Sequence, residues 1–158
     1  MIIRLFKPDD VEQIARLFQN TVRQINIKDY SLAQVKSWSP DNIYFRDWLD
    51  ICSTRFTYVA EQNNEIIGFG ELESNGHIDC FYVHYRYQNR GVGREIYYTI
   101  ENKAIALNLA RLYVEASITA KPFFLKQEFI ELKKQQVVCR GEKFINYVLE
   151  KRLTYHQE

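Results

Sequence analysis

Hydrophobic and polar positions recur along the chain in two periods, one typical of helices and one typical of strands. Apolar residues at helical spacing predict three helices in the first third of the sequence, at 8–25, 31–38 and 44–52. The first of these follows a short apolar strand at 2–6 and opens with a proline and two aspartates, which is typical of a helix N-terminus.

From residue 56 onward, short apolar runs bounded by turn residues replace the helical pattern. They predict six further strands, at 56–61, 65–73, 77–83, 111–117, 129–139 and 143–153. Two more helices are expected, at about 91–107 and 119–126. The first three of these strands are joined by short turns, so we expect an antiparallel meander. The strand at 111–117 follows a helix, which favours a parallel partner for the strand at 77–83. The pattern predicts a mixed α/β sheet with helices on its faces, unlike a doubly wound Rossmann fold.

Composition narrows the class of protein. A chain of 158 residues without repeats or linkers is expected to form a single domain spanning 1–158. Lys and Arg number 21 and Asp and Glu 20, so a basic face for nucleic acid is not indicated. The sequence has no long apolar run, so we expect no signal peptide, no membrane span and a cytoplasmic location. Its three cysteines are odd in number and far apart, which argues against a disulfide framework or a metal site.

The clearest chemical signal lies between the strand at 77–83 and the following helix. There the sequence FYVHYRYQNRGVG places Gln88, Gly91 and Gly93 in a QxxGxG pattern. A glycine turn that leads into a helix suits phosphate, because the first helical N–H groups lack partners and no Cβ blocks the approach. Arg90 and Arg94 add positive charge, as does Arg86. The alternative is a turn that only reverses the chain. The P-loop and dinucleotide patterns are both absent.

These residues resemble the acyl-CoA signature [QR]xxGx[GA] of the GNAT superfamily of N-acetyltransferases, with Val83 five residues before Gln88 as expected. The segments EIIGFGELE, GHID, VEAS and KPFF occur in the same order as in small bacterial members, and DYSLAQVKSWSP resembles the helical segment of one bacterial subgroup. The resemblance covers nearly the whole chain. It implies a central mixed, mostly antiparallel sheet with helices on both faces and a splayed pair of parallel strands.

The resemblance also implies acetyl-CoA as the cofactor. Its pantetheine would follow the backbone of Phe81, Tyr82 and Val83. Its pyrophosphate would bind the turn formed by Gln88, Asn89, Arg90, Gly91, Val92, Gly93 and Arg94. Ser117 would contact the cofactor or the acetyl carbonyl, or would simply cap the next helix. Phe124 stands where the family usually has a tyrosine that protonates the leaving thiolate, and Glu128 replaces the glycine of that segment. Phe124 would pack against the cofactor or in the core.

An attacking amine must lose a proton, which calls for a base or a water path. Strand alternation would place His77, Asp79, Phe81 and Val83 on one face, with the first two about 7 Å apart. In several relatives a glutamate that acts as the base occupies the place of His77, and an imidazole titrates near pH 6.5. His77, Asp79 and Glu73 are therefore the catalytic candidates, with Glu71 a lesser one. The alternatives are a half-exposed strand start for His77, a structural acceptor role for Asp79, and solvated strand ends for Glu71 and Glu73.

The acceptor is left open by the sequence. In GNAT folds the early helices border the acceptor site, so we expect some of Tyr30, Trp38, Tyr44 and Trp48 to shape it, although helix packing would equally explain these aromatics. The acceptor would be a small amine, a peptide N-terminus or a lysine, and a homodimer is possible. The alternative to an N-acetyltransferase is a non-catalytic acyl-CoA-binding or interaction module, which the phenylalanine at 124 supports.

Overall fold

Seven strands form one sheet in the computed structural model, which describes residues 1–153. They are β1 (Ile2–Leu5), β2 (Phe56–Gln62), β3 (Glu65–Leu72), β4 (His77–Val83), β5 (Arg111–Ser117), β6 (Ile130–Cys139) and β7 (Glu142–Arg152). Their order across the sheet is β1-β2-β3-β4-β5-β7-β6, and only the β4–β5 pair is parallel. The predicted mixed, mostly antiparallel sheet is confirmed. Residues 154–158 of the predicted single domain lie outside the described residues.

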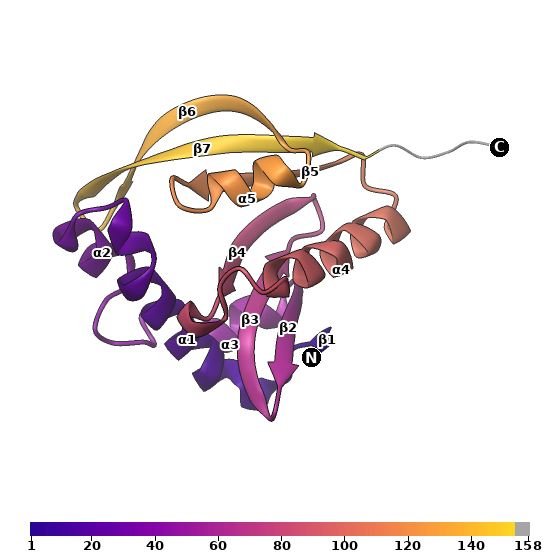
Figure 1. Ribbon diagram of the computed structural model, residues 1–158, viewed down its shortest axis with the longest axis horizontal. Helices are drawn as coiled ribbons and strands as arrows, with labels where there is room; N and C mark the ends of the chain where they lie inside the picture. The colour runs from indigo at the N-terminus through magenta and orange to yellow at the C-terminus, as the bar shows by residue number, and fades with distance from the viewer. Residues whose placement is uncertain (154–158) are drawn as a thin grey trace.

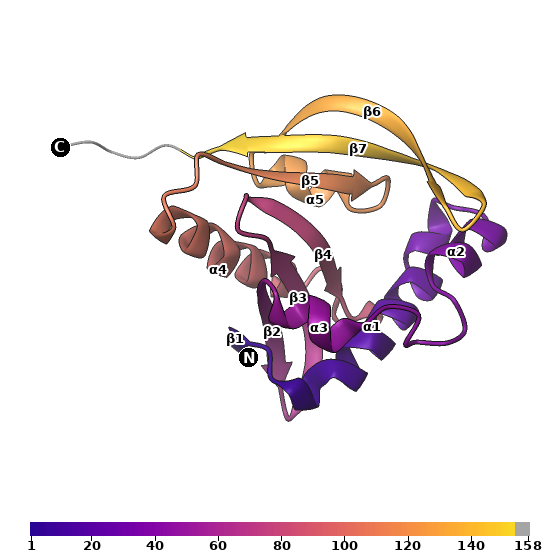
Figure 2. The ribbon, with the colours of Figure 1, turned by 180° about the vertical axis from the view of Figure 1, so that it is seen from behind.

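Helices cover both faces of the sheet (Figures 1 and 2). They are α1 (Val11–Gln24), α2 (Leu32–Trp38), α3 (Trp48–Ser53), α4 (Val92–Ala106) and α5 (Lys121–Lys126), with short 3₁₀ turns at Pro8–Asp10, Asn26–Lys28 and Tyr85–Tyr87. The first three helices pack on one face over one hydrophobic cluster, and α4 and α5 pack on the other face over a second cluster. The third helix is shorter than predicted because Asp47 caps it, accepting from the N–H of Asp50 at 3.2 Å.

Two glycines of β3 set the distance between the sheet and α4. A Cβ on Gly68 would lie 2.8 Å from Ile96 Cδ1, and one on Gly70 would lie 2.9 Å from Ile100 Cδ1. Both isoleucines are fully buried. Side chains at these two positions would push the helix outward, so glycine fixes the place of α4 and of its N-terminus.

The parallel pair separates after its first residues. His77 pairs with Tyr113 and Ile78 with Val114, and no pairing continues beyond them among the described strands. The side of β4 beyond Ile78 is therefore left without a strand partner toward β5 (Figure 2). This is the splay that the resemblance implied, and it opens the sheet from within.

A bulge in β4 overturns one expectation. The register with β3 passes from Gly70↔Phe81 to Leu72↔Ile78, so β4 carries one extra residue at this point. As a result, Ile78 and Phe81 both pack on the α4 side, whereas Cys80 packs on the α1 side. Strict alternation would have placed His77, Asp79, Phe81 and Val83 on one face. That expectation is wrong, because an extra residue in a strand reverses the side-chain alternation beyond it.

Candidate active site

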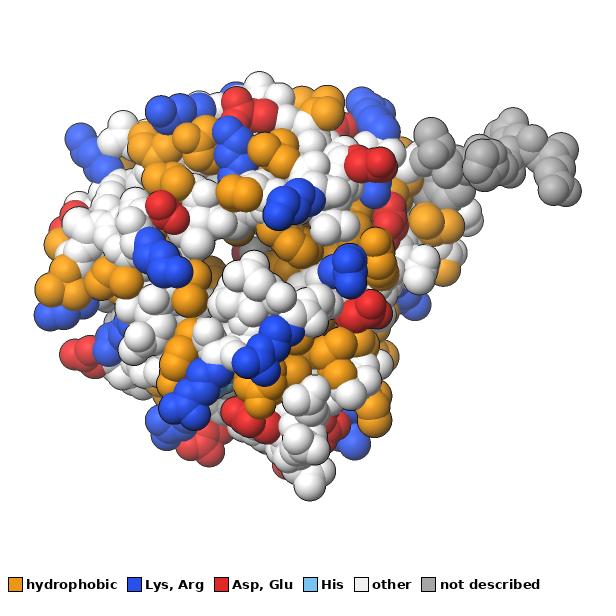
Figure 3. Space-filling model, in the orientation of Figure 1, with side chains coloured by type: hydrophobic (Ala, Val, Ile, Leu, Met, Phe, Trp, Pro, Cys, Tyr) orange, Lys and Arg blue, Asp and Glu red, His pale blue; other side chains and the backbone are white. Residues whose placement is uncertain are grey.

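Two cavities meet where β4 and β5 separate. The larger, of about 780 Å³, lies between the N-terminus of α4 and α5, and the smaller, of about 310 Å³, lies on the side of α1 and α2. Figure 3 shows the α4 face of the molecule hollowed between its two halves, with Lys and Arg side chains around the hollow. Five residues line both cavities: Trp38, Asp79, Tyr82, Glu115 and Ser117. Ligands in the two cavities could therefore touch through the gap in the sheet.

The larger cavity is lined by every residue that the sequence predicted for the cofactor. These are Phe81, Tyr82, Val83, Gln88, Asn89, Arg90, Gly91, Val92, Gly93, Arg94, Ser117 and Phe124. The turn residues lie at one end of the cavity and the aromatic residues of β4 and α5 along it. Arg86, predicted to add charge, instead stacks on Tyr85 at 5.4 Å and does not line either cavity.

The glycine turn is built to present backbone N–H groups. Gly91 is the N-cap of α4 with φ of 82°, a left-handed conformation that favours glycine. A Cβ on Gly93 would point into contact with Phe123 at 3.3 Å and Val83 at 3.5 Å, two residues that line the cavity. Gln88 holds the turn against the strand, because its side-chain amide donates to the carbonyl of Val83 at 2.6 Å. The first N–H groups of α4 and its positive dipole end thus border the cavity, a surface that suits phosphate.

Phe124 and Ser117 each have both of the features predicted as alternatives: a structural contact and a place on the wall of the larger cavity. Phe124 is 1% exposed and packs edge-on against Phe81 and Phe129, yet it also lines the larger cavity. The hydroxyl of Ser117 accepts from the N–H of Ala120 at 3.0 Å. Its own hydrogen stays available to a ligand, since a hydroxyl can donate as well as accept.

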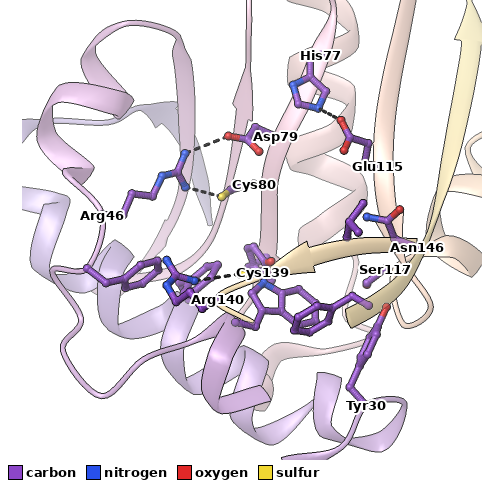
Figure 4. A pocket seen from close by; sticks show the side chains of 16 residues that line it. Tyr30, Arg46, His77, Asp79, Cys80, Glu115, Ser117, Cys139, Arg140 and Asn146 are labelled. Carbon is purple, nitrogen blue, oxygen red and sulfur yellow. Dashed lines mark hydrogen bonds and ion pairs between the residues drawn. The ribbon is translucent and has the colours of Figure 1, made fainter. Parts of the chain in front are cut away.

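The smaller cavity has aromatic walls (Figure 4). Its rings are Phe18, Tyr30, Trp38, Phe45, Tyr82 and Phe144. The Tyr30 hydroxyl donates to the carbonyl of Ile145 at 2.7 Å and accepts from the N–H of Ile118 at 2.9 Å, which ties the segment before α2 to the sheet. Of the early aromatics proposed for this site, Tyr30 and Trp38 line it. Trp48 is buried in the core and Tyr44 is exposed, so neither reaches it.

His77 lies in the smaller cavity between two carboxylates. Its Nε2 is 3.4 Å from Glu115 (Figure 4). Its Nδ1 is 3.2 Å from Glu73, and its ring stacks on Tyr113. Glu73 contacts the imidazole but lines neither cavity, whereas Glu115 lines both. Glu115 was not among the residues predicted from the sequence. The signal was present in RLYVEAS, where alternation places an isolated carboxylate on the face opposite the buried residues of β5.

Asp79 forms ion pairs with two arginines. Arg55 lies 2.6 Å and Arg46 lies 3.0 Å from the same carboxylate oxygen. The same arginines pair with Glu71, whose side chain is fully buried at 3.0 and 3.2 Å from them. Burial raises the pKa of Glu71, and the two guanidinium groups oppose that shift. Glu71 and one oxygen of Asp79 therefore act as acceptors in a structural network.

The same network includes the thiol of Cys80. Arg46 Nη1 lies 2.7 Å from its sulfur. Burial raises the pKa of Cys80 well above its ordinary value, so this thiol is neutral. Ligand atoms of Glu71, Asp79 and Cys80 lie within 4.8 Å of one another, but arginine contacts already surround them.

A sheet opened between two parallel strands, with one cavity on each side of the gap, defines an N-acetyltransferase domain of the GNAT class. Residues 26–151 match the family model described as acetyltransferase (GNAT) domain, and the chain belongs to that family. None of the helices among residues 1–153 is long and apolar enough to cross a membrane.

Known proteins agree with this assignment. The chain is 32% identical over 148 residues to the uncharacterized N-acetyltransferase YafP of Escherichia coli, covering 93% of each sequence. It is also similar to the crystal structure of a GCN5-related N-acetyltransferase from Rhodopseudomonas palustris, with a TM-score of 0.90, 29% identity, and coverage of 96% of this chain and 95% of that one. The PaiA N-acetyltransferase of Thermoplasma acidophilum, solved with coenzyme A, shares the fold at a TM-score of 0.76 and 15% identity, with coverage of 96% and 98%.

Proposed function

We propose that the protein transfers an acetyl group from acetyl-CoA to a primary amine by direct attack. The observation that carries this proposal is the junction of two unlike cavities at the gap between β4 and β5. One is a large cavity that ends at a helix N-terminus, and the other is a smaller aromatic cavity. A transfer without a covalent enzyme intermediate needs this arrangement, because donor and acceptor must meet in one place.

The larger cavity fits acetyl-CoA by its chemistry. The N–H groups of the turn from Gln88 to Arg94, together with the side chains of Arg90 and Arg94, suit the pyrophosphate. The backbone of β4 from Phe81 to Val83 faces the gap without a strand partner on that side and can bond the pantetheine amides. Its relative PaiA was solved with coenzyme A, which supports the same ligand class here.

The protein's own groups would handle the proton. When bound, acetyl-CoA supplies a thioester carbon that the amine nitrogen can attack. Glu115, at the mouth of both cavities, accepts the proton of the amine, and His77 Nε2 takes it onward. For that step His77 must carry its hydrogen on Nδ1 and donate it to Glu73 at 3.2 Å, which leaves Nε2 free to accept. Asp79 takes no proton in this scheme, since two arginines hold it.

The leaving sulfur is stabilised by a different residue than in most of the family. Phe124 has no proton to donate. Tyr82 lines both cavities, and burial raises the pKa of its phenol well above the ordinary value, so it stays protonated. We assign Tyr82 as a hydrogen-bond donor to the leaving thiolate. A phenol with a raised pKa is a weaker acid than a thiol of pKa about 8.5, so the sulfur leaves as the thiolate and takes its proton from solvent.

The test is release of free thiol from acetyl-CoA against a panel of primary amines. Glu115→Gln should lower kcat by about a hundredfold, the low end of general acid–base contributions, with the Kd for CoA unchanged. Glu12→Gln, on the solvent side of α1, is the matched control and should match the wild type. A kcat for Glu115→Gln within twofold of wild type would remove this residue from the proton path.

One alternative has a specific observation in its favour. Phe124 in place of the usual tyrosine is compatible with a module that binds acyl-CoA without turning it over. Binding of CoA by calorimetry, with no thiol release from any amine in the panel, would support that alternative and reject the transferase proposal.

A further inference from the structure

We propose that the acceptor is an amine that carries a carboxylate at the far end of an aromatic body, and that Arg140 binds this carboxylate. The inference rests on the proposed function and deepens it by naming the substrate class. It begins with an arginine in an unusual backbone conformation at the wall of the smaller cavity.

Arg140 occupies the tight turn between β6 and β7. Its φ is 45° and that of Gly141 is 83°, so both turn residues are left-handed. Such turns favour asparagine, aspartate and glycine, and a long side chain in this conformation is uncommon. A residue held in an unfavoured conformation is a reason to look for a role of its side chain.

The side chain of Arg140 is held by neutral groups alone. Its Nη1 lies 3.1 Å from the sulfur of Cys139 (Figure 4). The same Nη1 donates to the carbonyl of Ser37 at 2.9 Å, and the guanidinium lies 4.7 Å above the ring of Phe45. Within residues 1–153 no carboxylate lies within ion-pair distance of it. Arg46, which lines the same cavity, is by contrast neutralised by Glu71 and Asp79.

A guanidinium fixed in this way is ready to bind an anion. Its recorded hydrogen bonds to the rest of the described chain come from Nη1, which leaves the donors on Nε and Nη2. The fork of an arginine matches a carboxylate in a bidentate geometry. Because the side chain is already positioned, little further conformational entropy is lost when the anion binds.

The opposite end of the cavity suits an ammonium group. Glu115 lies at this end of the cavity. Asn146 also lies there, because it is the β7 partner of Ser117 in β5, next to the gap between β4 and β5. The Oδ1 of Asn146 is buried without a hydrogen-bond partner in the described part of the chain, so it can accept an N–H from the amine. Figure 4 shows Glu115 and Asn146 on one side of the cavity and Arg140 on the other.

The spacing of these two ends sets the length of the ligand. Asn146 follows Arg140 by six residues along the hairpin, which is roughly 20 Å of extended chain. Because both side chains line one cavity of about 310 Å³, the amine and the carboxylate should be well inside that limit, on the order of 10 Å apart. An α-amino acid, with one carbon between the two groups, is too short. The aromatic walls favour a flat apolar body between them.

Two probes that differ by one charge test this inference. They are 4-(2-aminoethyl)benzoate and the corresponding benzamide, and their binding is measured by calorimetry on the full chain with CoA present. The wild type should bind the carboxylate about tenfold or more tightly than the amide, as expected for a charge-assisted bidentate pair. Arg140→Asn should abolish that preference. Asparagine suits the left-handed turn, so this variant should fold.

The control is Arg16→Gln, an exposed arginine of α1 that lines neither cavity, which should keep the wild-type preference. Equal binding of the two probes, no binding of the carboxylate, or a preference that persists in Arg140→Asn would each overturn the inference. Failure of the proposed function has a different signature, because it would appear as the absence of thiol release with every amine, charged or neutral. Binding of the probes does not depend on turnover, so the two failures are separable.

Discussion

Gly93 offers the sharpest test of how the cofactor would sit, because a methyl group there should affect folding and binding differently. Gly93 lies in the first turn of α4 and does not need a left-handed backbone. Alanine in place of glycine within a helix is favourable by about 0.5–1 kcal/mol. The new Cβ would lie 3.3 Å from Phe123 and 3.5 Å from Val83, so the phenylalanine ring must move by a few tenths of an ångström. The two effects oppose each other, and the free energy of unfolding should stay within about 1 kcal/mol of the wild type.

Binding should respond more strongly than stability. The added methyl occupies the space between the first N–H groups of α4 and the opposite wall, where the pyrophosphate is proposed to lie. Loss of one hydrogen bond to a charged group costs about 1.5–3 kcal/mol, which corresponds to roughly tenfold to a hundredfold in Kd. Calorimetric titration with CoA measures the affinity, and urea denaturation measures the stability.

Gly91→Ala is a comparison variant in the same turn, whose main expected cost is in stability. Its Cβ would meet only Arg94, at 3.4 Å, but the backbone φ of 82° is unfavourable for alanine. It should therefore lower the free energy of unfolding by about 1–2 kcal/mol. In a chain of this size that corresponds to a fall in Tm of about 2–8 °C. If Gly93→Ala binds CoA within twofold of the wild type, the pyrophosphate does not lie against this turn.

Three further predictions concern two charged pairs and one tyrosine. Arg46→Met leaves Glu71 buried with one cation fewer and should lower the free energy of unfolding at pH 7, measured by urea denaturation, by about 3 kcal/mol. Because burial already raises the pKa of Glu71, this loss should shrink as the pH falls and the carboxylate is protonated. The double variant Arg46→Met with Glu71→Leu should recover most of the lost stability. The role of the pair would be refuted if the free energy of unfolding of Arg46→Met lay within about 0.5 kcal/mol of the wild type, far less than the expected loss of about 3 kcal/mol. For Asp10, burial alone would raise the pKa, but the bidentate pair with Arg4 at 2.8 and 3.0 Å helps to hold it below the ordinary 3.8. The Arg4–Asp10 pair therefore stabilises the fold above about pH 4, and this stabilisation is lost as the pH falls through the pKa of Asp10 in the folded protein. The difference in the free energy of unfolding between wild type and Asp10→Asn should vanish on acidification. A difference that stays constant down to about pH 2 would contradict this linkage. Tyr82→Phe should lower kcat in the thiol-release assay about tenfold, with the affinity for CoA unchanged. The effect is modest because a thiol of pKa about 8.5 is already a fair leaving group. Full activity of this variant would mean that the thiolate leaves without help from Tyr82.

The sequence predicted the elements of the fold well because local patterns dominate here. The helix at Val92–Ala106 and the strand at His77–Val83 are marked by apolar periodicity and by glycine and asparagine turns, which act within a few residues. The helix expected at 44–52 was too long, since Tyr44 and Phe45 fit helical spacing but lie in a turn before the capped start at Trp48.

Part of the candidate site could likewise be predicted from local sequence, and part could not. The cofactor residues came from one continuous motif and from the strand before it, so the sequence could name them together. The proton path could be read only in part, because Glu73 and His77 are neighbours across the β3–β4 turn, whereas Glu115 comes from β5, far along the chain. Asp79 was a reasonable candidate by type, but its arginine partners come from before α3 and just after it, and their approach depends on packing.

By itself the sequence determined the order of the elements, the glycine turn and the resemblance to one family, since each rests on residues close together in the chain. Only the tertiary structure decided which carboxylates are free and which are paired. It also decided that the bulge in β4 turns Phe81 away from His77, and that the β6–β7 turn brings Arg140 to the wall of the smaller cavity. The physical reason is that charge pairing and strand register depend on distances between segments far apart in sequence, which local periodicity does not encode.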